Sequence, residues 1–252
     1  MKTAAFKIGD VFPSQNCGHF EILSRTKGKA LVRFLSTGYI TVVEKGAVRK
    51  GLIKDNLHPS IYGLGFYGDG SYTKNLEQSL LSKVSETWHS MFKRCYSDSV
   101  HENHEPYSNC FVNKRWHDFQ NFAKFYIECP YRQTGWQLDK DILVKGNKEY
   151  GPDTCCFVPV GINGYMKTNS NRRGDYPIGV KLSYLKNSYE SRVRDFDGKQ
   201  ILLGKYATPE LAFEAYKSTK ENVIKQKAEF WKDQICPKVY HALLNFKVDI
   251  TD

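Results

Sequence analysis

The stretch WQLDKDILVKGNKEYGPDTCCFVPVGINGYM, residues 136–166, predicts a strand, a loop, a second strand and a short helix. Residues 136–143 alternate as a half-buried strand does, and Lys-Gly-Asn at 145–147 marks a tight turn. A second apolar run at 155–158 leads through Pro159, a residue suited to the first turn of a helix. The pattern therefore predicts a ββα unit.

This unit places oxygen-bearing side chains where they can converge. Asp139 and Asp141 are two residues apart on the predicted strand, so we expect them to share a face. Asn163, on the following helix, can close on them and complete a pocket for a hard divalent cation. The alternative is a plain hairpin whose acids are solvated.

The same layout resembles the ββα-metal finger of HNH nucleases, in particular the Leu-Asp-His-Asp run of the recombination endonuclease VII type. The resemblance implies that Asp139 and Asn163 bind one Mg²⁺ or Mn²⁺, and that Asn147 is the middle Asn of the motif. Lys140 stands where the family has the histidine that activates water. Three alternatives follow for Lys140: another residue is the base, the lysine acts as a charge on the phosphate, or the site has lost catalysis.

A longer likeness covers residues 88–163, which resemble bacteriophage HNH homing-type endonucleases. In that group the Asp-Lys-Asp variant of the motif is common. The motifs that carry the likeness are Trp88-x2-Met91-x2-Arg94-Cys95-Tyr96, Tyr107-x2-Cys110-x-Val112, Trp116-x2-Phe119-x2-Phe122, Leu138-Asp139-Lys140-Asp141-Ile142, Gly146-Asn147-Lys148, Tyr150-x-Pro152-x2-Cys155 and Phe157-Val158-Pro159-x2-Ile162-Asn163.

Two histidines in the loop after the predicted helix 76–96 are candidates for the missing base. His101 and His104 have no cysteine near enough for a zinc site, so metal binding is the weaker interpretation. The alternatives are a catalytic role and a solvated loop.

Residues 178–230 predict three antiparallel strands and a helix that opens at Thr208-Pro209. They resemble the AP2 DNA-binding domain in Gly179-Val180, Arg194-Asp195, Leu203-Gly204 and the Ala212-x2-Ala215-Tyr216 helix, whose sheet side we expect to include Leu211. The resemblance implies that the sheet contacts DNA, whereas the alternative is that its arginines only solubilise it. The predicted DNA-binding residues, with the preceding linker included, are Arg172, Arg173, Lys181, Lys186, Tyr189, Arg192, Arg194 and Lys199.

The N-terminal residues 6–55 read as short strands at 20–23, 30–35 and 39–43, for which we predict a small SH3-like barrel. The segment 61–74 is rich in Gly and Tyr and predicts an irregular loop or linker. Apolar residues at helical spacing predict a helix over 76–96.

The fold class is thus α+β with several modules. The predicted divisions are a β module (1–60), a linker (61–75), an HNH-like domain (76–168) and an AP2-like domain with a tail that packs back on another module or on a second copy (169–252).

Charge and cysteine content bound the function. A net charge of +10 favours a polyanionic partner, above all double-stranded DNA. Seven cysteines without a CxxC pair favour reduced thiols and therefore a cytoplasmic protein, in the host's cytoplasm if the chain is phage-encoded. The sequence has no long apolar span of the kind that predicts a membrane segment. The endonuclease VII type depends on CxxC zinc pairs, so the chain is not a close member of it.

The leading hypothesis is a phage-type DNA endonuclease that uses one divalent metal. Its alternatives are a catalytically inactive DNA-binding protein of a phage, acting as a regulator or an inhibitor of host defence, and an RNA- or ribosome-associated basic protein. A homodimer is a further option.

Overall fold

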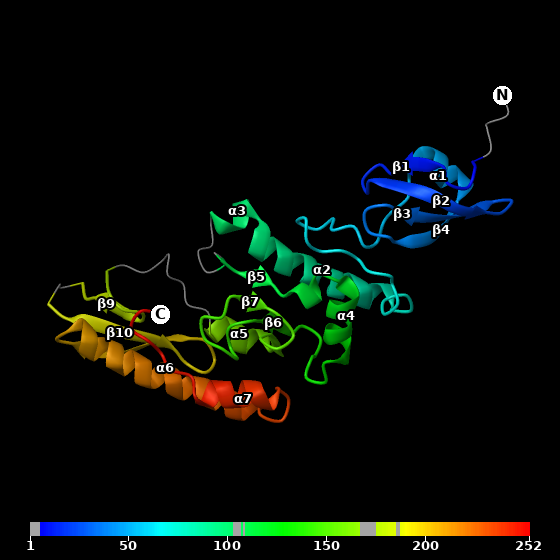
Figure 1. Ribbon diagram of the computed structural model, residues 1–252. Helices are drawn as coiled ribbons and strands as arrows, with labels where there is room; N and C mark the ends of the chain where they lie inside the picture. The colour runs from blue at the N-terminus through cyan, green and yellow to red at the C-terminus, as the bar shows by residue number, and fades with distance from the viewer. Residues whose placement is uncertain (1–5, 103–106, 108, 167–174, 185–186) are drawn as a thin grey trace. The chain divides into compact units, whose positions relative to one another are not determined.

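The computed structural model describes residues 6–102, 107, 109–166, 175–184 and 187–252, and Figure 1 shows it as a mixture of helices and small sheets. The predicted α+β class is confirmed. The chain divides into two compact units, Met1–Tyr126 (unit 1) and Ile127–Asp252 (unit 2), and this boundary falls inside the predicted segment 76–168.

Unit 1 begins with a four-stranded antiparallel sheet, the N-terminal sheet, in the order β1-β2-β3-β4. Side chains that alternate along its strands turn one face inward around Phe20, Ile22, Val32 and Phe34, all of which are fully buried. The bounds are Val11–Pro13 for β1, His19–Arg25 for β2, Lys29–Phe34 for β3 and Ile40–Glu44 for β4.

The prediction of a closed SH3-like barrel is wrong, because this sheet stays open in the described residues. The chain passes from β4 directly into a short helix, α1 (Lys45–Lys50), and not into a further strand. Val48 of α1 packs into the core beside Phe6 and Ile53. The open side is therefore covered by a helix and by coil segments.

The rest of unit 1 is mainly helical. The helix predicted over 76–96 is confirmed as α2 (Gln78–Tyr96), whose buried face includes Trp88. The Trp88 indole Nε1 donates to the carbonyl of Trp116, at 2.7 Å, which ties α2 to the segment before α4. The remaining elements are α3 (Asp98–His101), β5 (Phe111–Val112), a 3₁₀ turn (Lys114–Trp116) and α4 (Phe119–Glu128).

The Gly- and Tyr-rich segment 61–74 has no regular helix or long strand, as predicted, but it is tightly bound. The Gln120 side chain of α4 accepts hydrogen bonds from the backbone of Tyr72 and Thr73 and donates to the carbonyl of Tyr67. The segment is therefore an ordered loop on α4.

Unit 2 contains the predicted ββα unit, which we call the finger (residues 137–166). Its strands β6 (Gln137–Asp139) and β8 (Cys156–Val158) pair antiparallel, with Asp139 opposite Cys156. A loop containing β7 (Glu149–Tyr150) joins them, and α5 (Val160–Met166) follows directly after Pro159.

The second part of unit 2 is a three-stranded antiparallel sheet, ordered β11-β10-β9. We call it the reading sheet after the DNA-contacting role that the sequence predicts for it. Helix α6 (Pro209–Trp231) packs along one side of it (Figure 1). Thr208 caps the helix through its side chain, as predicted, whereas Leu211 is 54% exposed and Phe213 takes its place against the sheet. The strands are β9 (Val180–Leu182), β10 (Tyr189–Arg194) and β11 (Gln200–Tyr206).

Helix α6 serves two hydrophobic cores. Its first turns bring Phe213 and Tyr216 to Val193 of the reading sheet. Its last turns bring Val223 and Ile224 into the core of the finger, which α7 (Pro237–Leu244) also covers. The tail thus packs back on another part of the chain. At 1.5 Å per residue, the 23 residues of α6 span roughly 35 Å and join both parts.

Candidate metal site and nucleic-acid interface

The finger brings Asp139 and Asn163 to the same side of β6. Alternation along the strand puts Gln137 and Asp139 on one face, opposite the buried Leu138. Asn163 of α5 is 6% exposed, and its Nδ2 donates to Oε1 of Gln137 at 2.7 Å. This bond ties α5 to the strand face on which alternation places Asp139.

Asp139 is held in a fixed orientation by the backbone after it. Its Oδ1 accepts from the amides of Asp141 and Ile142, each at 2.8 Å. Burial raises the pKa of the Asp139 carboxyl, against the opposing effect of these two amides. Oδ2 of Asp139 receives no hydrogen bond from the described residues, so one carboxylate oxygen is available to a ligand.

The same two hydrogen bonds end the strand, which corrects one expectation. The strand predicted over 136–143 stops at Asp139, because the Asp139 side chain competes with the sheet for the next amides. Asp141 therefore lies in a turn, and the argument that Asp139 and Asp141 share a strand face is wrong.

Lys140 and Asp141 form an ion pair instead. The Lys140 side chain is only 5% exposed. Its Nζ lies 2.7 and 2.8 Å from the two carboxylate oxygens of Asp141. It also donates to the carbonyl of Asn147 at 2.8 Å. The ammonium thus donates to three acceptors of the loop, and it occupies the position that a cation bidentate on Asp141 would need.

Asn147 closes the loop between the two strands of the finger. Its Nδ2 donates to the carbonyls of Lys140 and Glu149, and its Oδ1 accepts from the Glu149 amide. Every polar atom of the amide is used within the loop. Asn147 thus fixes the loop that holds Lys140.

The histidines considered as the base, His89, His101 and His104, belong to unit 1 by sequence. Nε2 of His101, in α3, is 3.1 Å from the carbonyl oxygen of Arg94, and His104 is not among the described residues. His89 of α2 is 3.1 Å from the Tyr67 hydroxyl, and burial lowers its pKa.

Asp139 and Asn163 carry oxygen donors of the kind that Mg²⁺ prefers, and this ion commonly binds through one or two protein groups while it keeps several waters. Within the part of the chain that the structure describes, no three His, Cys, Asp or Glu side chains gather as a metal site.

The reading sheet presents cations on the face away from α6. Val193 and Ser191 are buried toward the helix, so Arg192 and Arg194 point the other way. Arg192 contacts Glu190, whose Oε2 lies 2.9 Å from Nη2 of Arg192, and this hydrogen bond lowers the pKa of the Glu190 carboxyl. The strand register then places Lys181 and Lys205 opposite Glu190, one on each side.

The predicted DNA-binding residues do not all lie on the same face of the sheet. Lys181, Arg192 and Arg194 share the outer face, and Lys199 lies exposed in the turn before β11. Tyr189 falls on the opposite face by alternation, and its ring packs on Tyr176 at 5.3 Å. The predicted residues that lie outside the described part of the chain are Arg172, Arg173 and Lys186.

Two residues of this face, Lys205 and Glu190, were not predicted as site residues. Lys205 has a side chain 54% exposed and approaches Glu190 to 3.9 Å. Lys205 and Glu190 are identified by the register between strands β10 and β11, because alternation within one strand does not tell which residues of two strands lie opposite each other. In the described part of this face, Lys181, Arg192 and Lys205 therefore lie around the Glu190 carboxylate, and Arg194 lies further along β10.

Among the described residues, no helix combines the length and the hydrophobicity needed to cross a bilayer. No protein-family model, no curated protein and no solved structure matches the chain.

Proposed function

We propose that this chain is a DNA endonuclease of the HNH–AP2 type, in which the reading sheet binds the duplex and the finger cuts it. The observation that carries the proposal is the contact between Asn163 and Gln137, because it brings the finger helix to the strand face of Asp139. The N-terminal sheet has no role assigned in this proposal.

The outer face of the reading sheet supports duplex DNA as the partner. Lys181, Arg192, Arg194 and Lys205 form a cationic surface on a regular, two-dimensional framework. Such cations neutralise phosphates, and an arginine that reaches a base edge recognises guanine with two hydrogen bonds. Glu190 holds Arg192 in one orientation, which favours a defined contact.

In the finger, Asp139 and Asn163 are the residues that would hold Mg²⁺ or Mn²⁺. A bound divalent ion stabilises the negative charge that develops on the leaving 3′-oxygen. The two amides on Asp139 orient its carboxylate, and the ion pair of Lys140 keeps the loop closed behind it. Because Lys140 is engaged on Asp141 and on the Asn147 carbonyl, we assign the base that accepts a proton from water to a residue other than Lys140.

A second function, DNA binding without cleavage by a phage regulator or an inhibitor of host defence, is favoured by one observation. Lys140 replaces the catalytic histidine of HNH fingers and is locked on Asp141. A homodimer, a cytoplasmic location and the phage origin remain predictions.

The test is incubation with supercoiled phage and host DNA in Mg²⁺ or Mn²⁺, with electrophoresis to separate nicked from intact plasmid. We expect the wild type to nick DNA and Asp139→Ala or Asn163→Ala to lose nicking while retaining affinity. Asp233→Ala, which removes an exposed acid of the same unit, is the matched control. Nicking that persists in Asp139→Ala would reject this site, and wild-type binding without nicking would favour the second function.

A further inference from the structure

The finger and the reading sheet of unit 2 are connected by more than α6. The hydroxyl of Tyr165, near the end of α5, donates to the carbonyl of Arg194 on β10 at 2.8 Å. Tyr165 follows Asn163 by two residues, and Arg194 lies on the outward face of the sheet. One hydrogen bond therefore spans from the candidate metal helix to the strand that carries candidate DNA contacts.

Two lysines of α6 reinforce this junction. Lys220 donates to the carbonyl of Tyr165 at 2.6 Å, with its ammonium 4.0 Å from the centre of the Tyr165 ring. Lys227 donates to the carbonyl of Phe196, just after β10, at 2.7 Å and lies 5.2 Å from the same ring. The two lysines are seven residues apart, so they project from one side of the helix and flank Tyr165.

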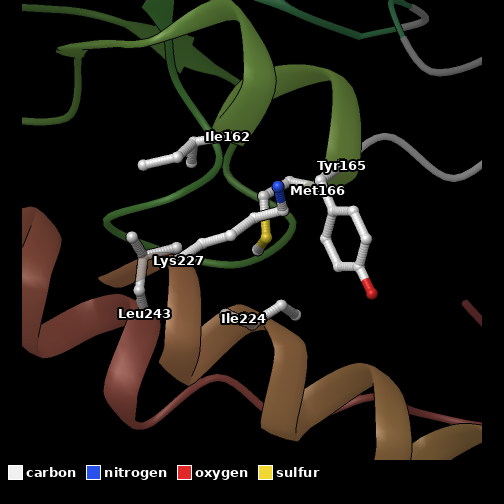
Figure 2. Close-up of a pocket in the computed structure, with 6 residues that line it drawn as sticks. All are labelled: Ile162, Tyr165, Met166, Ile224, Lys227 and Leu243. Atoms are coloured by element: carbon white, nitrogen blue, oxygen red, sulfur yellow. The ribbon is translucent and has the colours of Figure 1, made fainter. Parts of the chain in front are cut away.

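The contact around Lys227 is closely packed. Figure 2 shows its side chain among Ile162 and Met166 of α5, Ile224 of α6 and Leu243 of α7. Burial lowers the pKa of Lys220 to about 8, as expected for an ammonium enclosed between α5 and α6. The junction is therefore a packed interface with directional hydrogen bonds.

A second connection runs through the tail. Lys145, in the finger loop, donates to the carbonyl of Lys247 at 2.9 Å. The next residue, Val248, is 3% exposed within the core of the reading sheet, and its amide donates to Glu221 of α6. The finger and the sheet are thus braced at two separate places.

We propose that Tyr165, Lys220 and Lys227 are positioning residues that lock the finger to the reading sheet as one rigid body, so that the DNA is cut at one fixed distance from the sequence that the sheet binds. This inference rests on the proposed endonuclease function. A packed core changes between discrete arrangements and does not deform continuously, so a single spacing is expected rather than a range.

The experiment uses the full chain and a DNA site selected in vitro for binding by Asp139→Ala. Hydroxyl-radical footprinting locates the sheet on an end-labelled duplex, and sequencing gels locate the wild-type cuts. We expect one main cut position per strand at a constant distance from the footprint. In Tyr165→Phe and Lys227→Met, cutting at that position should fall roughly 10-fold, with new cuts at neighbouring phosphates.

Tyr240→Phe is the matched control, because the hydrogen bond that the Tyr240 hydroxyl donates to Glu229 stays within the α6–α7 hairpin. It should keep the single position. A merely structural role for Tyr165 would reduce the amount of cleavage without moving the cuts, and that result would overturn the proposal. So would wild-type cuts scattered over several distances.

A second measurement needs no variant, so it tests the rigid body even if the variants fold poorly. Residual dipolar couplings of the wild-type protein should fit one alignment tensor for the finger and the reading sheet together, and two independent tensors would overturn the rigid body. Absence of cleavage with an intact footprint would reject the proposed function and the fixed spacing with it. Scattered cleavage would reject the spacing alone.

Discussion

Lys140 in the finger and Lys181 on the reading sheet are both cations of unit 2, yet one is buried and the other is exposed. Lys140 donates its hydrogen bonds to Asp141 and Asn147, in the loop that follows Asp139. Lys181 is exposed to solvent opposite Glu190 and, among the described residues, forms no ion pair. The finger therefore uses charge to fix its own shape, whereas the sheet displays charge to a partner.

The two regions are also held to α6 by different means. The sheet packs on the helix through close apolar contact, and Gly179 makes that contact possible because its φ is +78° and a Cβ would lie 2.0 Å from the Tyr216 ring. The finger adds polar bonds at Tyr165. Each difference can be tested, from the largest expected effect to the smallest.

The largest effect is expected from Gly179→Ala, which would break the packing of the sheet on α6. The added methyl group meets Tyr216 and the left-handed backbone disfavours alanine, so we expect the free energy of unfolding to fall by at least about 3 kcal/mol. Urea denaturation measures it.

Gly198→Ala is the control, since Gly198 has a φ of +86° but no atom lies within 4 Å of the position that an added methyl group would take. It should cost only about 1–2 kcal/mol, the strain of the backbone alone. Equal losses in the two variants would contradict the packing argument.

The second test uses pH on the partly buried ammonium of Lys220, for which the described residues supply no ion pair. Burial lowers the pKa of Lys220 from 10.5 to about 8, so between these values the unfolded chain binds more protons than the folded one. Stability should therefore rise as pH increases from 8 to 10.5, by up to about 3 kcal/mol.

In Lys220→Met this rise should disappear, while stability at pH 7 stays equal or increases. The measurement is the urea midpoint at a series of pH values, with Lys238→Met of α7, an exposed lysine, as the reference. The same pH dependence in both variants would refute the assignment to Lys220.

The third test compares the two lysines directly. Lys140→Met leaves the Asn147 carbonyl and the Asp141 carboxylate without their donor, so we expect a loss of about 2 kcal/mol, less than for a fully buried pair because Asp141 is half exposed. Lys181→Met should change stability by no more than about 0.5 kcal/mol. Similar losses would remove the contrast between the regions.

The smallest effect in free energy concerns binding. Arg194→Ala and Lys205→Ala should each weaken DNA affinity by roughly 10-fold and reduce the slope of log K against log salt by about 0.9 per lost phosphate contact. Lys238→Ala should leave both unchanged. The measurement is fluorescence anisotropy with a labelled duplex over a range of salt, and unchanged slopes for Arg194→Ala would exclude it as a phosphate contact.

The sequence predicts the elements that repeat regularly. The spacing of Trp88 and its neighbours identifies α2, and the alternation Arg192-Val193-Arg194 places two arginines on the outer face of the sheet. Pro159 and Thr208 correctly mark the starts of α5 and α6. Local signals of this kind need no knowledge of distant partners.

The features that the sequence does not predict depend on single side chains or on distant pairings. The strand over 136–143 ends early because Asp139 takes the amides of Asp141 and Ile142, which no alternation pattern reveals. The place of Lys205 opposite Glu190 requires the strand register, and the open N-terminal sheet depends on α1.

Helix α6, which belongs to both cores, limits how this protein can be re-engineered. Replacing the chain from residue 175 onward with another DNA-binding domain would also replace α6. The finger would then lose its contacts with Val223, Ile224 and Lys227. A new preference for a DNA sequence is better introduced by substituting the outward side chains of β9, β10 and β11 one at a time. Natural variants of this architecture should diversify in the same way, with the inner side of α6 held constant.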